Sequence, residues 1–210
     1  SCVVRFSQMP ARRRDTLVRQ RQIVDAARKL IIKVGSEHVT ARRIAKEIGI
    51  SESAIYRHFR SKRDILSLLV DHIEDNLLGD IRKGQAVVTS TTLERLDSAL
   101  RYHISAVEKR RGVSFQVIAE IVSLGDKKLN QKISQTIDKY ISCLKGLLAE
   151  GVRAGEVRGD IDLEAAATFL FGGIQGLVNI WALSNYSFSP EERYQALWDL
   201  FRRAISSQQV

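Results

Sequence analysis

The chain has 210 residues, of which 44% are hydrophobic and 27% charged, and this composition supports a folded core rather than a disordered chain. The formal net charge is +9. Residues 1–66 hold 16 Lys and Arg against 6 Asp and Glu, whereas residues 67–210 hold 17 against 18. A merely solvated basic surface would spread its charge evenly. One basic end on an otherwise neutral chain is typical of a nucleic-acid-binding module joined to a second domain.

The two cysteines, Cys2 and Cys143, lie far apart and form no C-x-x-C motif. We therefore expect no disulfide framework, no metal site and no cofactor, and we expect Cys143 to be a small buried hydrophobic residue. The apolar run at the N-terminus is too short before its arginines for a signal peptide. We predict a flexible basic arm over residues 1–13 and a cytoplasmic location.

An all-α fold of about nine helices is predicted. The only prolines are Pro10 and Pro190, and no segment alternates with the period of two that marks a strand. The first helix covers residues 17–34. Thr40 is a suitable N-cap for a short second helix that Gly49 closes.

Ser51 begins a short third helix, so two short helices are joined by a turn of about three residues that contains glycine. This is a helix-turn-helix signature. Ser61 begins a long fourth helix that would link two domains, with an apolar face at Ile65, Leu69, Ile73, Leu77 and Ile81. Thr91 with Glu94 begins the fifth helix, a shorter helix lies around Val117, and a long apolar pattern runs from Leu129 to Val152. The last two helices begin at Asp162 and at a capping box from Ser189 to Glu192.

Residues 40–62 read TARRIAKEIGISESAIYRHFRSK, and this stretch resembles the TetR/AcrR family of transcriptional regulators. The family pattern is matched by Ser51, Tyr56, Phe59, Ser61 and Lys62. The resemblance covers about fifty residues and implies a three-helix DNA-binding domain over 14–62 and a helical ligand-binding and dimerisation domain over 63–210. It also implies a regulator, generally a repressor, that binds double-stranded operator DNA of pseudo-palindromic sequence as a homodimer.

A recognition helix presents its first turn to base edges in the major groove. Here that turn is Glu52, Ser53 and Ala54, and Arg57 follows one helical turn later. Arg57 either binds a guanine edge or holds a phosphate. Glu52 departs from the lysine that is frequent in the family, so its role stays open.

The resemblance implies phosphate contacts by Thr40, Ser51, Tyr56, His58 and Lys62. Arg43 completes the candidate DNA-binding set. For Tyr56 and His58 the alternative is packing against the domain core. Arg12, Arg13 and Arg14 either touch the DNA or belong to a solvated tail.

No charged residue occurs in the 26 positions from Ala165 to Pro190. We reject a membrane span because polar residues and glycines dilute this stretch and no second span accompanies it. Burial between two subunits is expected instead. The resemblance implies that the last two helices form this interface, with candidates Phe169, Gly172, Gly173, Gly176, Leu177, Trp181, Trp198 and Phe201. The alternative for the glycines is packing within one subunit.

Polar and aromatic residues on apolar helix faces are candidates for an effector pocket, although each is also a common structural residue. They are His72, Asn76, Tyr102, His103, Phe115, Gln116 and Tyr140. We expect an unidentified, mainly apolar effector such as a fatty acyl derivative, an aromatic or a drug-like compound. The resemblance implies that this effector tilts the fourth helix and releases the DNA.

The two rival classes of function are an enzyme and a DNA-bound recruiter of a protein partner. An enzyme is rejected because the four histidines show no paired spacing and no nucleophile or phosphate-loop motif accompanies them. The second keeps the DNA-binding domain but recruits a protein partner without an inducer, as the nucleoid-occlusion members of the family do.

Overall fold

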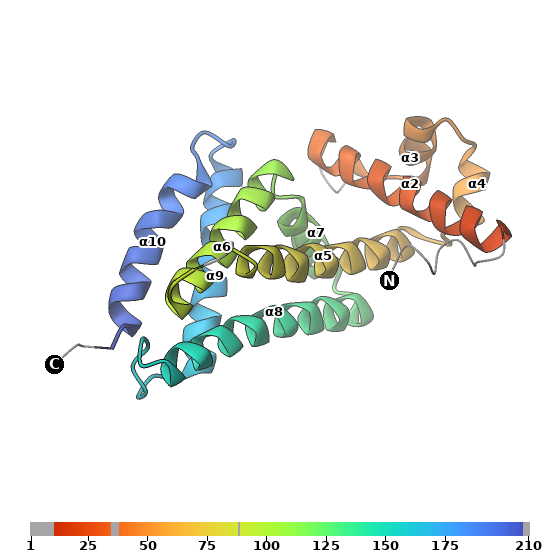
Figure 1. Ribbon diagram of the computed structural model, residues 1–210. Helices are drawn as coiled ribbons and strands as arrows, with labels where there is room; N and C mark the ends of the chain where they lie inside the picture. The colour runs from red at the N-terminus through yellow and green to blue at the C-terminus, as the bar shows by residue number, and fades with distance from the viewer. Residues whose placement is uncertain (1–10, 35–37, 88, 208–210) are drawn as a thin grey trace.

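The computed structural model describes residues 11–34, 38–87 and 89–207, and in these residues the fold is all-α, as predicted (Figure 1). The helices in this part of the chain are α2 (Ala11–Val34), α3 (Ala41–Ile48), α4 (Glu52–Tyr56), α5 (Lys62–Gln85), α6 (Thr92–Lys109), α7 (Val113–Leu124), α8 (Lys127–Arg153), α9 (Leu163–Leu183) and α10 (Pro190–Ile205). The group α2–α4 lies at one end of the molecule and α10 at the other (Figure 1).

Helices α2, α3 and α4 form a small domain, which we call the head. Its core contains Ile23, Ala27, Ile44, Ile55 and Phe59, all buried. Helix α2 begins before the predicted start, so residues 11–13, which the sequence assigned to the arm, are helical. The remainder of the predicted arm, residues 1–10, lies outside the described residues.

Helix α5 leaves the head and runs into the second domain alongside α6 and α8 (Figure 1). Its predicted apolar face is confirmed, because all five of its named residues are buried. Gly84 marks the closest approach of α5 to α6. A Cβ atom there would lie 2.6 Å from the carbonyl oxygen of Ser98 and would overlap the backbone of Ala99, so no larger residue fits without displacing a helix.

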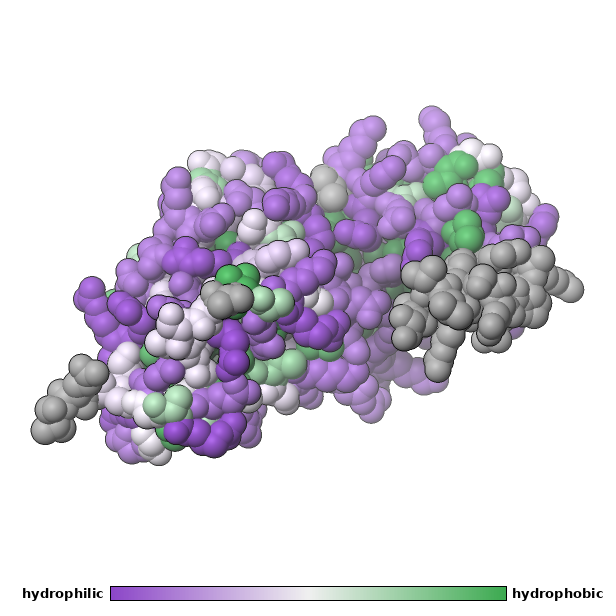
Figure 2. Space-filling view, viewed as in Figure 1, coloured by the Kyte–Doolittle hydropathy of each residue, from purple (hydrophilic) through white to green (hydrophobic). Residues whose placement is uncertain are grey.

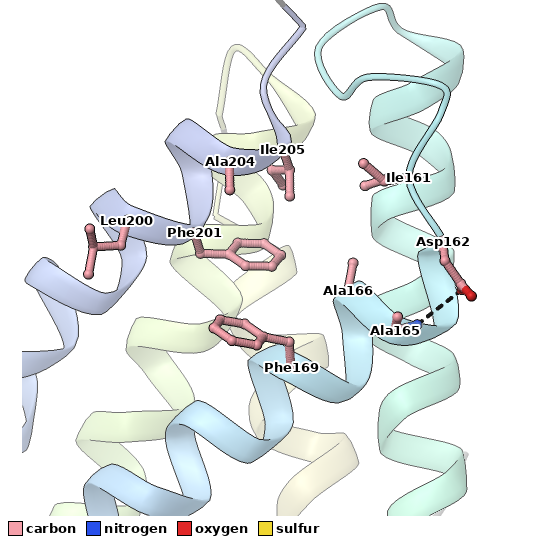
Figure 3. Close-up of a pocket in the computed structure, with 9 residues that line it drawn as sticks. All are labelled: Ile161, Asp162, Ala165, Ala166, Phe169, Leu200, Phe201, Ala204 and Ile205. Atoms are coloured by element: carbon pink, nitrogen blue, oxygen red, sulfur yellow. Dashed lines mark hydrogen bonds between the residues drawn. The ribbon is translucent and has the colours of Figure 1, made fainter.

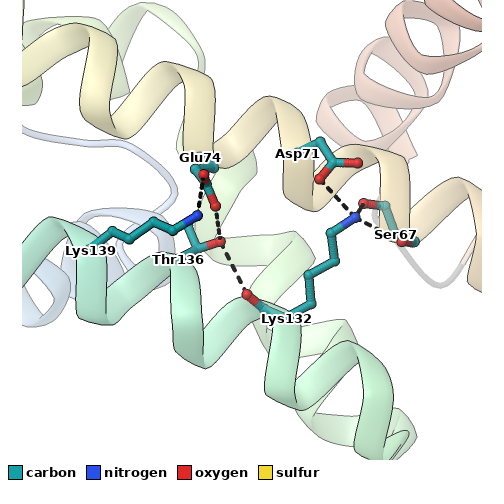
Figure 4. A network of polar contacts seen from close by, with 6 residues as sticks. All are labelled: Ser67, Asp71, Glu74, Lys132, Thr136 and Lys139. Atoms are coloured by element: carbon teal, nitrogen blue, oxygen red, sulfur yellow. Dashed lines mark hydrogen bonds and ion pairs between the residues drawn. The ribbon is translucent and has the colours of Figure 1, made fainter.

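Polar contacts fasten α8 along α5 (Figure 4). Lys132 Nζ donates to the backbone oxygen of Ser67 at 2.7 Å and pairs with Asp71 at 2.8 Å. One turn further, the hydroxyl of Thr136 donates to Glu74 at 3.1 Å. These contacts fix the register of the two helices.

The carboxylate of Glu156, in the loop between α8 and α9, caps the start of α6. Its two oxygens accept hydrogen bonds from the backbone nitrogens of Thr92 at 2.9 Å and Leu93 at 2.8 Å. The next residue, Val157, forms an isolated antiparallel bridge with Ser206 at the end of α10. Three distant segments are thus joined at the base of the second domain.

Two local predictions were wrong. Ser189 makes no side-chain capping bond, and Pro190 at the first helical position begins α10 through its fixed φ. Cys143 is exposed rather than buried. The inward face of α8 passes through Tyr140 and Leu144, and Cys143 lies off that face.

Candidate functional site

Two local hydrogen bonds and one glycine shape the helix-turn-helix. The hydroxyl of Thr40 accepts from the backbone nitrogen of Arg43 at 3.2 Å, which begins α3. Gly49 ends α3 with φ +68°, a conformation that glycine adopts without strain. The hydroxyl of Ser51 then accepts from the nitrogen of Ala54 at 3.2 Å and begins α4. Helix α4 ends at Tyr56.

Most side chains of the candidate DNA-binding set lie at the surface of the head. The exposed ones are Thr40, Arg43, Ser51, Glu52, Ser53, Tyr56 and Arg57, and the partly buried ones are Ala54, His58 and Lys62. Tyr56 is 52% exposed, so packing against the core does not account for it, whereas His58 is half-buried. Arg43 donates to the backbone oxygen of His38 at 3.2 Å.

Lys62, the first residue of α5, lies in an ion pair that the sequence did not reveal. Its Nζ is 2.6 Å from Glu120 Oε1 on α7. The adjacent Arg63 pairs with Asp126 at 2.6 Å, and Asp126 also caps α8. Backbone donors lower the pKa of Asp126. Two basic residues at the edge of the head are therefore held by carboxylates of the second domain.

Among the candidate effector residues, the structure brings His103 and Tyr140 together. Their ring centroids lie 5.4 Å apart, and both side chains are buried. The prediction that Tyr102 belongs to an effector pocket is corrected, because its side chain is exposed to solvent. Lys83 Nζ lies 5.9 Å from its ring centroid. Neighbouring helical residues differ by about 100° in direction, which separates Tyr102 from His103.

The other candidates lie elsewhere. His72 lines a surface hollow between α2 and α5, and Gln116 donates to the hydroxyl of Tyr186 at 3.1 Å. Phe115 packs against the core and Asn76 is half-buried. These positions do not converge with Tyr140 on one pocket.

Sequence reasoning missed Asp80 and Arg110, which lie beside His103. Asp80 is 4% exposed and pairs with the guanidinium of Arg110. Burial opposes the charge of Asp80, but contacts with His103 and Arg110 outweigh that effect and lower its pKa. A signal was present, since Asp80 follows Ile73 and Leu77 on the buried stripe of α5.

Helices α9 and α10 carry an exposed apolar face, which includes the groove in Figure 3. Its exposed large residues are Phe169, Ile180, Leu183, Leu197 and Leu200. Gly172, Gly173 and Gly176 have open space around them, so packing inside the subunit does not require glycine there. On the face shown in Figure 2, by contrast, hydrophobic residues form only small separate groups.

Among the predicted interface residues, Trp181 and Trp198 are buried within the subunit. Leu177 and Phe201 are also largely buried, but they line the apolar grooves of the α9–α10 face. The buried stripe of α10 runs through Tyr194, Trp198 and Phe201. Leu197 and Leu200 project to the other side, and the sequence analysis did not name them.

By length and composition alone, α9 would be able to cross a membrane, and one-third of its most apolar window is buried inside the subunit. Leu170, Ile174 and Val178 are among the residues that pack in the core. This is the stretch for which the sequence analysis rejected a membrane span.

Comparison with known proteins covers both domains. The profile of the family described as "Bacterial regulatory proteins, tetR family" matches residues 23–69, and the profile described as "YsiA-like protein, C-terminal region" matches residues 70–203. The fatty acid metabolism regulator protein of Bacillus subtilis (strain 168) is 27% identical over 80% of this chain and 85% of its own length. The nucleoid occlusion factor SlmA of Vibrio atlanticus (strain LGP32) is 26% identical over 89% of this chain and 95% of its own.

Solved structures give the same fold. The regulator FadR from Bacillus subtilis in complex with stearoyl-CoA has a TM-score of 0.72 and 26% identity, covering 86% of this chain and 96% of that one. FadR from Bacillus halodurans has a TM-score of 0.74 and 22% identity, covering 87% and 94%. From the two matched profiles, which together extend from the head to α10, the chain belongs to the TetR family of transcriptional regulators, with a YsiA-like C-terminal region.

Proposed function

We propose that this protein binds a pseudo-palindromic operator as a homodimer, represses transcription in the cytoplasm, and is released when a fatty acyl thioester binds its second domain. The observation that carries the proposal is the exposed first turn of α4 beside Arg57, on a basic head joined by α5 to a separate helical domain.

DNA reading is assigned to the surface of α4. Ser53 is small and exposed, which permits close approach to base edges, and the Arg57 side chain is exposed next to it. The hydroxyl of Ser53 lies 2.9 Å from that of Ser51, so the two hydroxyls form one polar pair at the N-terminus of the helix. Thr40 and Tyr56 are proposed to contact flanking phosphates.

The Arg57→Ala variant tests this assignment by fluorescence anisotropy on DNA from upstream of the gene. We expect a tenfold to hundredfold loss of operator affinity, corresponding to about 1–3 kcal/mol. The control is Arg82→Ala, because Arg82 is an exposed arginine on α5 in the second domain. An unchanged preference for operator over random duplex would remove Arg57 from the base contacts and leave only a phosphate role.

Dimerisation is assigned to the apolar face of α9 and α10. Leu183 is 85% and Leu200 67% exposed, and such a face is unfavourable in water unless another surface covers it. A two-fold copy would cover it with the same residues. The two recognition helices of such a dimer would enter half-sites about 34–36 Å apart.

The effector class is drawn from relatives and from the second domain. The B. subtilis FadR structure contains stearoyl-CoA, and the corresponding region here has a large apolar core. We expect stearoyl-CoA to release the wild-type protein from operator DNA and to raise its melting temperature. If acyl-CoA of every chain length failed to release the protein from DNA, this effector class would be contradicted. The proposal that the protein binds operator DNA would not be affected.

The similarity to the nucleoid occlusion factor SlmA supports a second candidate, a DNA-bound recruiter of a protein partner. It predicts that the protein binds a cell-division protein while on DNA and that acyl thioesters leave its melting temperature unchanged. Measuring both properties on one preparation separates the two functions.

A further inference from the structure

The interior of the second domain contains ionisable groups where three helices meet. Asp80 comes from α5, His103 from α6 and Tyr140 from α8, and each is at most 4% exposed. Buried polar groups are costly unless they are paired. The guanidinium of Arg110 pairs with Asp80, so the two opposite charges compensate each other.

The other two groups are not satisfied. The hydroxyl of Tyr140 has no hydrogen-bond partner among the described residues, and its ring is 1% exposed. His103 Nδ1 lies 3.4 Å from Asp80 Oδ2, but this contact does not meet the geometry of a hydrogen bond. A buried hydroxyl without a partner is unfavourable and rare, so it requires an explanation.

Burial favours the neutral form of both groups. Burial raises the pKa of the Tyr140 phenol, and the nearby Asp80 adds to this effect. Burial also lowers the pKa of His103 more than Asp80 raises it. The phenol of Tyr140 can therefore donate a hydrogen bond, and the imidazole of His103 offers a second hydrogen-bonding atom beside it.

We propose that Tyr140 and His103 form the recognition point for the polar group of the effector, and that this group is an uncharged carbonyl such as that of a thioester or amide. A free carboxylate is disfavoured because it would enter beside the charged Asp80, and both terminal nitrogens of Arg110, the arginine that pairs with Asp80 among the described residues, already contact the Asp80 carboxylate. The ring of Phe171, whose centroid lies 5.8 Å from that of Tyr140, adds an apolar aromatic wall.

This inference rests on the proposed function and links it to the DNA. Tyr140 and His103 are shielded from solvent, so the helices around them, which include α5, α6 and α8, have to separate before a ligand reaches them. A ligand that binds the separated form better shifts the protein toward it. Because α5 begins beside the head at Lys62, its displacement changes the position of the head.

The test uses two buried tyrosines that differ in whether the hydroxyl has a hydrogen-bond partner. Tyr194 is 2% exposed, but its hydroxyl donates to Asp97 at 2.9 Å, whereas the Tyr140 hydroxyl has no such partner. We expect Tyr140→Phe to melt at or above the wild-type temperature and to need about tenfold more stearoyl-CoA for release from DNA. We expect Tyr194→Phe to melt about 5 °C lower and to keep the wild-type response.

Stearamide and stearic acid test the charge of the recognised group, since both have the same chain and differ in the head. Stearamide should raise the melting temperature of the wild type but not of Tyr140→Phe, and stearic acid should have a much smaller effect. Equal responses to the amide and the acid would overturn the neutral-group assignment. If wild type and Tyr140→Phe needed the same stearoyl-CoA concentration for release from DNA, the role of Tyr140 would be overturned and the effector class would stand. A wild type that responds to none of the three compounds would overturn the proposed effector class as well.

Discussion

The two ends of α5 differ in how their polar groups are satisfied. At the head end, Lys62 and Arg63 pair with Glu120 and Asp126 near the surface. At the other end, Asp80 is buried with Arg110, beside groups that have no hydrogen-bond partner among the described residues. At the head end the charged side chains are paired within the protein, whereas at the other end buried polar atoms can still form hydrogen bonds.

This contrast agrees with the proposed control of DNA binding by an effector. A surface that binds DNA transiently has to be stable without it, so its charges find partners within the protein. In a core that binds a regulatory ligand, buried groups without a partner add to the binding free energy when the ligand forms hydrogen bonds with them. The same helix contacts both environments, which makes the packing of α5 against its neighbours the feature to perturb first.

The largest effect is expected from Gly84→Ala. The added methyl group would overlap the backbone of α6, which cannot move aside as a flexible side chain would. We expect a loss of about 3 kcal/mol in the free energy of unfolding, measured by urea denaturation. Gly146→Ala on α8 is the control, because nothing lies near its Cβ position, and it should gain about 0.5–1 kcal/mol. Equal stabilities of the two variants would show that α5 and α6 tolerate separation.

A smaller effect is expected from Glu120→Gln, which removes the charge that holds Lys62. The released ammonium group becomes available to a DNA phosphate, so affinity should rise about threefold to tenfold at low salt. The slope of log affinity against log salt should steepen by about one unit.

Glu164→Gln is the matched control, because Glu164 also pairs with a lysine, Lys145 at 2.8 Å, but does so on α9, outside the head. It should leave DNA affinity unchanged. If Glu120→Gln behaved in the same way, competition between Glu120 and phosphate for Lys62 would be refuted.

The smallest effect concerns pH and His103. Its pKa is lowered in the folded state by burial, so the folded protein binds fewer protons than the unfolded chain. Stability is intact above the ordinary histidine pKa of about 6.5 and falls as pH drops through that value toward the lower folded pKa. Asp80, Arg110 and Tyr140 are the titratable groups that face the imidazole.

We therefore expect the wild-type melting temperature to fall between pH 7.5 and 5.5, and His103→Asn to lose part of that dependence. His72→Asn is the control, since His72 is only half-buried on the side of α5 toward α2. A His103→Asn variant with the full wild-type pH profile would mean that other groups govern stability in this range.

The helices and most of their caps could be predicted because they depend on local sequence. Thr40, Ser51 and Thr91 cap helices in the structure as expected. The buried stripe of α5 followed from its spacing. Ser189 is an exception, because a capping motif permits a hydrogen bond without requiring it.

Contacts between helices could not be predicted, since they depend on how distant segments meet. The sequence placed Tyr102 and His103 in one candidate pocket, although only His103 faces inward. The sequence also placed Trp198 at the interface with a partner subunit, although its side chain is buried within one subunit. The residues around Lys62 in the sequence do not indicate its pairing with Glu120, which lies 58 residues away in the chain.

The cap that Glu156 places on α6 fastens one end of that helix. The first turn of α6 is joined through Glu156 and Val157 to the end of α10. At the other end, Arg110 lies at the corner where the chain turns into α7, and it pairs with the buried Asp80 of α5. Because both ends of α6 are fastened, a ligand that displaced α5 would have to break the pair of Asp80 and Arg110 or carry the corner with it, together with α7 and its Glu120.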